Sequence, residues 1–263
     1  MAGYFGTEQQ QALQQRTYEM RAWIEATPGV YNAGRFIGFD DPDRHDPQLL
    51  EEMLARDGLL GFRMLTPHQA AARFGTLEAA GCRVDTWDVF VGDRCEAATE
   101  VRSITAWPLP SGLRLLPSPA GADSAGTVGL QRFLADNGLA PFPGSMLVSR
   151  PPRARTIVIA HDDEPAAAGH TYFPHNSHSR FGRHAWVGLV AVGERWRGAG
   201  LGRLVTAMLV QAAFEELGAT HVYAMAGPAN AASRRMIEGC GMRHDPELRS
   251  GVAVPAGAAR FTR

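Results

Sequence analysis

The sequence is poor in the features that mark several classes of protein. Cysteine occurs only three times in 263 residues, at Cys82, Cys95 and Cys240, far apart and without a CxxC pair. This spacing gives no indication of a disulfide framework or of a thiolate zinc site. The formal net charge of −1 offers no electrostatic argument for binding nucleic acid or an anionic membrane surface.

Long apolar segments are also missing. No apolar run is long enough to cross a bilayer, and the opening "MAGYFGTEQQQALQQ" lacks the basic start and apolar core of a secretory signal. Apolar residues make up 45% and charged residues 20% of the chain, as is usual for globular proteins. We therefore expect a soluble cytoplasmic protein with one large domain or two modest ones.

Proline, glycine, serine and alanine accumulate between about residues 107 and 127, which places a boundary there. Helix start signals at Thr7, Asp46 and Thr66 predict that residues 1–104 are a mainly helical region, and residues 82–92 within it read as a strand. We expect the first helix to end near Thr27, and the tail of the chain to hold one or two short strands.

Residues 105–263 alternate between strand and helix patterns. We expect strands at 112–117, 155–162, 165–174, 184–192 and 220–227, and helices at 123–137, at 202–217 and after Asn230. Strands in series, followed by alternating strands and helices, predict a mixed α/β fold with helices on both faces of a sheet.

A glycine-rich turn, "RWRGAGLGRL" (195–204), lies between an expected strand and an expected helix. Free amides at a helix N-terminus bind phosphate, and glycine lets the backbone approach it closely. A P-loop is excluded because lysine and Ser/Thr are missing from its end, and a dinucleotide fingerprint would need glycine where Arg203 stands.

The remaining pattern, Arg-x-x-Gly-x-Gly, is met by Arg197, Gly200 and Gly202. With the preceding "GLVAVGERW" it resembles the pyrophosphate loop of the GCN5-related N-acetyltransferase (GNAT) superfamily. "NAASRRMIEGCGM" (230–242) resembles that superfamily's second cofactor segment, and the likeness extends over about 105–263. It implies the acyl-CoA N-acyltransferase fold, with a mostly antiparallel central sheet. Residues 1–104 are either a region of unknown role that shapes the acceptor side or a degenerate second copy of the fold.

The resemblance implies acetyl-CoA as co-substrate, with its pantetheine arm entering like a missing strand beside residues 190–192. It assigns cofactor binding to Val190, Val192, Arg197, Gly198, Ala199, Gly200, Leu201, Gly202, Arg203, Asn230 and Ser233. The Val192 amide would donate to the acetyl carbonyl and stabilise the oxyanion. Asn230 could equally be a plain helix N-cap.

The acid and base that many members use are absent from the matching positions. Ile237 stands where a tyrosine acid is common, and Trp186 where some members carry a carboxylate base. Histidines at 170, 175, 178 and 184 gather instead near the expected acceptor side, and imidazole titrates close to neutral pH. We take His184 as the first candidate for the base and His175 as the second, beside the alternative that they are structural, and we expect no metal site.

The expected function is therefore an acyltransferase that moves acetyl from acetyl-CoA to a primary amine by direct attack in a ternary complex. The acceptor would be an amine-bearing small molecule or peptide, with neither nucleic acid nor membrane as partner, and a homodimer is common among relatives. The alternative is a non-catalytic module that senses acyl-CoA, which the missing tyrosine and carboxylate keep open.

Overall fold

One sheet organises the molecule. The computed structural model describes residues 2–258, and within them ten strands form a sheet in the order β1-β2-β3-β10-β4-β9-β8-β7-β6-β5. The pairs β2–β3 and β8–β9 are parallel, and the other neighbours are antiparallel. The strands are β1 (Val30–Asn32), β2 (Ile37–Phe39), β3 (Leu60–Leu65), β4 (Cys82–Asp93), β5 (Leu113–Leu115), β6 (Ala154–His161), β7 (Glu164–Tyr172), β8 (His184–Val192), β9 (His221–Ala226) and β10 (Arg243–Pro255).

The helices begin where capping residues end extended chain. Thr7 and Thr66 form the predicted capping boxes with Gln10 and Gln69, and Asp46 caps the next helix. The helices are α1 (Glu8–Glu19), α2 (Arg21–Ala26), α3 (Pro47–Asp57), α4 (Pro67–Ala79), α5 (Arg94–Thr105), α6 (Ala125–Asp136), α7 (Gly144–Leu147), α8 (Leu201–Glu215) and α9 (Ala231–Glu238), with 3-10 turns η1 (Pro42–Arg44) and η2 (Glu194–Trp196). Two details differ from expectation: the first helix breaks at Met20, and the tail forms one 13-residue strand, β10.

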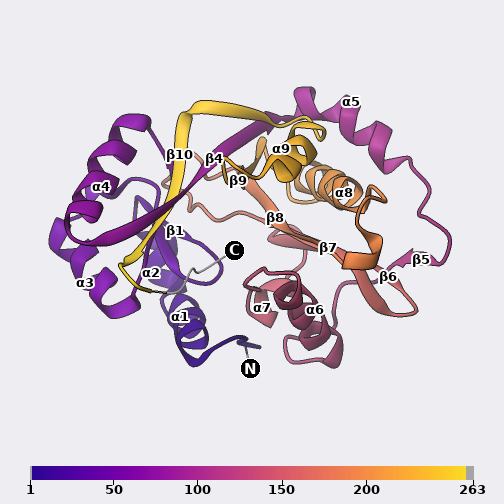
Figure 1. The fold of residues 1–263 in the computed structure, drawn as a ribbon, viewed down its shortest axis with the longest axis horizontal. Helices are drawn as coiled ribbons and strands as arrows, with labels where there is room; N and C mark the ends of the chain where they lie inside the picture. The colour runs from indigo at the N-terminus through magenta and orange to yellow at the C-terminus, as the bar shows by residue number, and fades with distance from the viewer. Residues whose placement is uncertain (1, 259–263) are drawn as a thin grey trace.

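Helices cover both faces of the sheet, as predicted. Neighbouring residues of β6 point to opposite sides: Ile157 packs in the core under α5, α8 and α9, whereas Val158 packs in the core under α6 and α7. Figure 1 shows α8 and α9 on one side of these strands and α6 with α7 on the other. A third core joins α2, α3 and α4 to β1–β3. Among the described residues, no helix has the length and apolar character required to cross a membrane.

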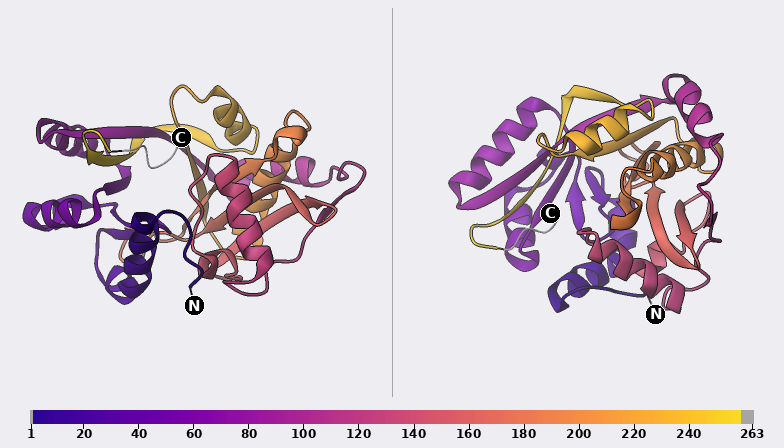
Figure 2. Two further views of the ribbon diagram at one scale, coloured as in Figure 1. Left: turned by 60° about the horizontal axis from the view of Figure 1, so that its bottom comes forward. Right: turned by 45° about the vertical axis from the view of Figure 1, so that its right-hand side comes forward.

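The sheet runs across the boundary predicted after residue 104. Strand β4 belongs to the first region, yet it lies between β9 and β10 of the second. Its residues Val89 and Phe90 are fully buried, one in each of the two cores that flank the central strands. The N-terminal elements gather at one end of the sheet and β5–β7 at the other (Figure 2).

Candidate active site

The parallel strands β8 and β9 pair only at their beginnings. Their register covers His184–Trp186 on β8 and His221–Tyr223 on β9 and then stops, although β8 continues to Val192 and stays paired with β7. Among the described residues no strand therefore pairs with the β9 side of β8 beyond Trp186. Backbone N–H and C=O groups along such an open edge can bind an extended ligand as an added strand.

A bulge in β8 lies where the two strands part. The register with β7 shifts between Ala168 and His170, and Leu189 adopts a positive φ of 51°. The preceding Gly188 leaves room for the indole of Trp186, since a Cβ at Gly188 would lie 2.1 Å from Trp186 Cζ2. The backbone here is thus shaped by one glycine and one aromatic ring.

The glycine-rich turn connects the end of β8 to α8. Gly198 and Gly200 have φ of 84° and 78°, a left-handed conformation that favours glycine. Gly200 is the N-cap of the 15-residue helix α8 and supplies no side-chain cap, so the first amides of the helix lack a capping partner. A Cβ at Gly198 would meet nothing within 4 Å, so the turn is open on that side. These features suit an anion at the start of α8.

Helix α9 borders the space between β8 and β9 where the two strands are no longer paired. The Asn230 Oδ1 accepts a hydrogen bond from the Ser233 backbone N–H at 3.0 Å, so Asn230 is a helix N-cap. Both residues also line the cavity between β8 and β9. Helix α8 approaches α9 at Gly202, where a Cβ would lie 3.1 Å from the Met236 Sδ.

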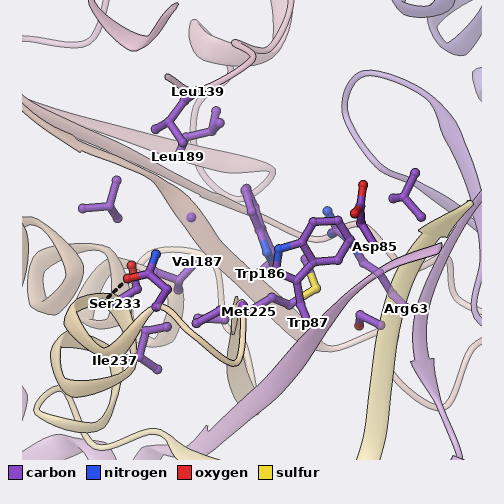
Figure 3. A pocket seen from close by; sticks show the side chains of 18 of the residues that line it. Arg63, Asp85, Trp87, Leu139, Trp186, Val187, Leu189, Met225, Ser233 and Ile237 are labelled. Atoms are coloured by element: carbon purple, nitrogen blue, oxygen red, sulfur yellow. Dashed lines mark hydrogen bonds between the residues drawn. The ribbon is translucent and has the colours of Figure 1, made fainter. Parts of the chain in front are cut away.

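The cavity reaches well beyond the two strands. Figure 3 shows Ser233 and Ile237 of α9 at one end and Arg63 and Asp85 of the N-terminal region at the other, with aromatic rings between them. The lining also includes backbone or side chains of Tyr31, Arg35, Phe36, Phe62, Trp87, Leu139, Trp186, Val187, Gly188, Leu189, Val190, Thr206, Met225, Asn230, Met236, Ser250 and Val252.

A chain of buried hydrogen bonds ends at the guanidinium of Arg63. Asp40 Oδ2 lies 2.6 Å from His175 Nδ1, His175 Nε2 lies 3.0 Å from the Tyr223 hydroxyl, and Arg63 Nη1 donates to that hydroxyl at 3.2 Å. Since the carboxylate accepts from Nδ1–H, Nε2 accepts from Tyr223, whose oxygen accepts from Arg63. Burial lowers the pKa of His175 and raises the pKa of Tyr223, so both are neutral at pH 7.

Residues 130–242 match the profile described as the acetyltransferase (GNAT) family. They form a GNAT domain.

Solved structures share the fold of the chain. A GCN5-related N-acetyltransferase from Kribbella flavida aligns at 18% identity with a TM-score of 0.58, over 90% of this chain and 82% of its own. A tandem GNAT protein from the clavulanic acid biosynthesis pathway aligns at 15% identity with a TM-score of 0.51, over 85% and 76% of the two chains. A GCN5-related N-acetyltransferase-like protein from Streptococcus suis aligns at 14% identity with a TM-score of 0.53, over 80% of this chain and 76% of its own. A comparison with curated proteins gives no match.

Within the GNAT domain, three of the residues predicted to bind the cofactor line the cavity, namely Val190, Asn230 and Ser233. Val192 lies at the end of β8, outside the lining, and its carbonyl accepts from Arg197 Nε at 3.4 Å. The remaining predicted residues, Gly198, Ala199, Gly200, Leu201, Gly202 and Arg203, form the turn and the first residues of α8. The turn thus follows directly from the strand that borders the cavity.

The predicted histidines do not meet in this cavity. His184 lies at the start of β8, stacks on His221 with ring centroids 4.4 Å apart, and lines a separate hollow with Asp245 and Glu247. Burial and then the charge of His221 lower its pKa to about 4. His175 is buried and belongs to the chain of hydrogen bonds that ends at Arg63. Among the described residues, no group of three His, Cys, Asp or Glu side chains could hold a metal ion.

Three further residues bear on where an acid or a base could lie. Cys240 is buried, its thiol donates to the Arg203 carbonyl at 3.5 Å, and burial raises its pKa to about 12. Ile237, where many relatives carry a tyrosine, does line the cavity. Trp186 lines it too, with its ring lying over Gly188.

Sequence reasoning allowed the N-terminal region to shape the acceptor side but did not identify which of its residues reach the site. Arg63, Asp85 and Trp87 come from β3 and β4, and their positions depend on strand order across the whole sheet. One local signal existed. A lone arginine in the apolar strand sequence "LLGFRML" is unusual, because arginine is rarely buried without a special partner.

Proposed function

We propose that the chain transfers acetyl from acetyl-CoA to a primary amine by direct attack in a ternary complex. The observation that carries the proposal is the parting of β8 and β9 after Trp186 and Tyr223, which opens an unpaired strand edge into a cavity that α8 lines at Thr206. The GNAT family profile over residues 130–242 supports acyl transfer as the reaction class.

The described residues fit acetyl-CoA. The uncapped amides of Leu201, Gly202 and Arg203 at the start of α8, with the amide of Gly198 beside them, would hold the diphosphate, helped by the dipole of α8. The open edge of β8 near Val190 and Val192 would bind the amides of the pantetheine arm, and Asn230 with Ser233 would contact the arm from α9. A backbone N–H of β8 would stabilise the negative charge that develops on the carbonyl oxygen.

The amine must lose a proton, and the departing thiolate gains one. Because Cys240 is buried with a pKa of about 12 and already donates to Arg203, it is poorly placed to supply that proton. A thiolate leaves readily without an acid, so the missing tyrosine at Ile237 does not prevent turnover. His184 and His175 as bases stay predictions. His184 lies outside the cavity, so a proton from the amine would have to reach it through solvent. His175 lies within the hydrogen-bond chain, so a proton would have to reach it through the groups of that chain.

Ile237 replaces the tyrosine acid, and Trp186 the carboxylate base, that other members carry. The absence of these two groups favours the second candidate, a non-catalytic acyl-CoA sensor. Release of free thiol from acetyl-CoA, measured with a panel of amines, separates the two. We expect amine-dependent release for at least one amine, whereas tight binding of acetyl-CoA in calorimetry without release on any amine would show a sensor. The chain contains arginine but no lysine, so its own side chains offer no acceptor amine and the background should be low.

A further inference from the structure

The end of the cavity remote from α9 carries an excess of positive charge. Its charged lining residues are Arg35, Arg63 and Asp85, and Asp85 Oδ2 already lies 3.4 Å from Arg83 Nε. Arg35 donates to the Ala140 carbonyl and lies over the Phe142 ring. Arg63 is the charged lining residue at this end for which the described residues supply no carboxylate partner, which favours an anion here over a cation.

Arg63 is the more unusual of the two arginines. It is 4% exposed, and its guanidinium lies between the rings of Tyr31 and Trp186, with 5.1 and 5.0 Å to the ring centroids. The groups that face it are tyrosine hydroxyls, and no described carboxylate forms an ion pair with it. Asp40, at the far end of the hydrogen-bond chain, is engaged by His175 and Ser179. Buried charges are normally paired, so a guanidinium on a cavity wall without an acid partner marks a binding site for an anion.

The hydrogen-bond chain also fixes where Arg63 points. Tyr223 accepts from one Nη1–H and the Tyr172 hydroxyl also faces the guanidinium, which has five N–H donors in a planar fork. The indole Nε1 of the neighbouring Trp186 is buried and has no hydrogen-bond partner among the described residues. Several donors of the kind that a carboxylate accepts thus lie together at this end of the cavity.

Arg63 lies toward the acceptor side of the bulge. The proposed cofactor path follows the later part of β8, from Val187 toward the glycine turn, whereas Arg63 packs on Trp186 at the earlier part. Three residues of strand from Trp186 to Leu189 span about 10 Å, and the indole leans back over Gly188 within that span. A molecule with an anionic group a few bonds from its amine could place the amine near the bulge and the anionic group at the Arg63 guanidinium.

We propose that Arg63 binds an anionic group of the acceptor, so that the substrate class is amines that carry a carboxylate or a similar anion. This inference rests on the proposed function, because it names the acceptor of that same reaction. Arg35 adds positive charge at the same end, and the chain Asp40–His175–Tyr223 holds Arg63 in place.

The test compares matched acceptors in the full-length protein. Turnover of acetyl-CoA is measured with β-alanine against 3-aminopropanamide and with 4-aminobutyrate against 4-aminobutanamide, in wild type, Arg63→Gln, Arg63→Lys and the control Arg114→Gln. Arg114 is an exposed arginine paired with Asp163, outside the cavity. Calorimetric titration with acetyl-CoA reports on the cofactor site of each variant.

We expect wild type to prefer the carboxylate amines in kcat/KM, and Arg63→Gln to reduce that preference about ten- to hundred-fold, the usual value of a hydrogen bond to a charged group. Arg63→Lys should retain part of the preference, and Arg114→Gln all of it. The affinity for acetyl-CoA should stay within about twofold of wild type in Arg63→Gln, and the loss of kcat/KM should be smaller for the neutral amines than for the carboxylate amines.

Three results would overturn the proposal. Wild type could accept neutral amines as well as carboxylate amines, or Arg63→Gln could lower turnover of both kinds equally. Alternatively, Arg63→Gln could spare carboxylate amines with acetyl-CoA and instead lower turnover of succinyl-CoA with neutral amines, which would assign the anion to the acyl donor. Absence of thiol release with every amine would, separately, overturn the acetyltransferase function itself.

Discussion

At the scale of single residues, burial decides the charge of the histidines. Burial lowers the pKa of His170 from its usual 6.5 to about 3, and its Nδ1 lies 2.9 Å from the Thr156 hydroxyl in the core under α6 and α7. A histidine that folds in its neutral form binds its proton more weakly than in the unfolded chain. Stability is then complete above pH 6.5 and is lost as the pH falls toward 3.

Replacement of His170 by glutamine should flatten this acid dependence. The free energy of unfolding of wild type should fall by up to about 1.4 kcal/mol per pH unit from His170 alone below pH 6.5. Urea denaturation of His170→Gln between pH 7 and 4.5 should show a shallower decline, while His178→Gln, at an exposed histidine, should follow wild type. Parallel declines in wild type and His170→Gln would contradict this account.

At the scale of elements, the helix and strand signals of the sequence were largely reliable. Thr7, Asp46, Thr66 and Asn230 each cap a helix as predicted, and the strand predicted over 184–192 has those bounds in the structure. These features are local, since a cap depends on residues within one helical turn. The bulge at Leu189 could not be predicted, because it depends on the register between β7 and β8.

The Gly188→Ala change tests the shape of the bulge. A Cβ there would lie 2.1 Å from the Trp186 ring, so the indole must leave its position on the cavity wall. We expect about a tenfold or greater loss in kcat/KM and a loss of stability of about 1–3 kcal/mol, typical of overpacking. Gly126→Ala on α6 is the matched control, because its Cβ would meet nothing within 4 Å.

Equal effects of the two glycine substitutions on amine-dependent thiol release would show that the Trp186 position has no role in the site. Trp186 fluorescence does not isolate this residue, because the chain has five tryptophans. Steady-state kinetics with thermal unfolding of both variants is therefore the appropriate measurement.

At the scale of the whole molecule, the two regions share one sheet and one cavity. Strand β4 separates β9 from β10, and α5 packs on α8, so the GNAT domain is completed by residues from the first 104. The boundary near residue 107 could be predicted from composition, but the strand order could not, because strand pairing over long separations leaves no local pattern. For the same reason Arg63 and Asp85 could not be placed in the site, whereas the glycine turn could. Whether residues 1–104 are a degenerate second copy stays a prediction.

This arrangement predicts that residues 105–263 do not fold alone. A fragment of residues 105–263 lacks β4. The edges of β9 and β10 that pair with β4 would then be exposed, and each of the two cores would lose a fully buried side chain, Val89 or Phe90. Circular dichroism should show no cooperative thermal transition for 105–263, while 81–263, which keeps β4 and α5, should show one. Cooperative unfolding of 105–263 together with normal acetyl-CoA binding would contradict the prediction.

The central claim, that the gap between β8 and β9 receives the arm of acetyl-CoA, is tested most directly by a crystal structure of the protein grown with CoA. The account predicts the diphosphate on the amides of residues 198–203 and the pantetheine arm along the open edge of β8 near Val190. CoA bound elsewhere, with β8 and β9 parted around an empty gap, would contradict it.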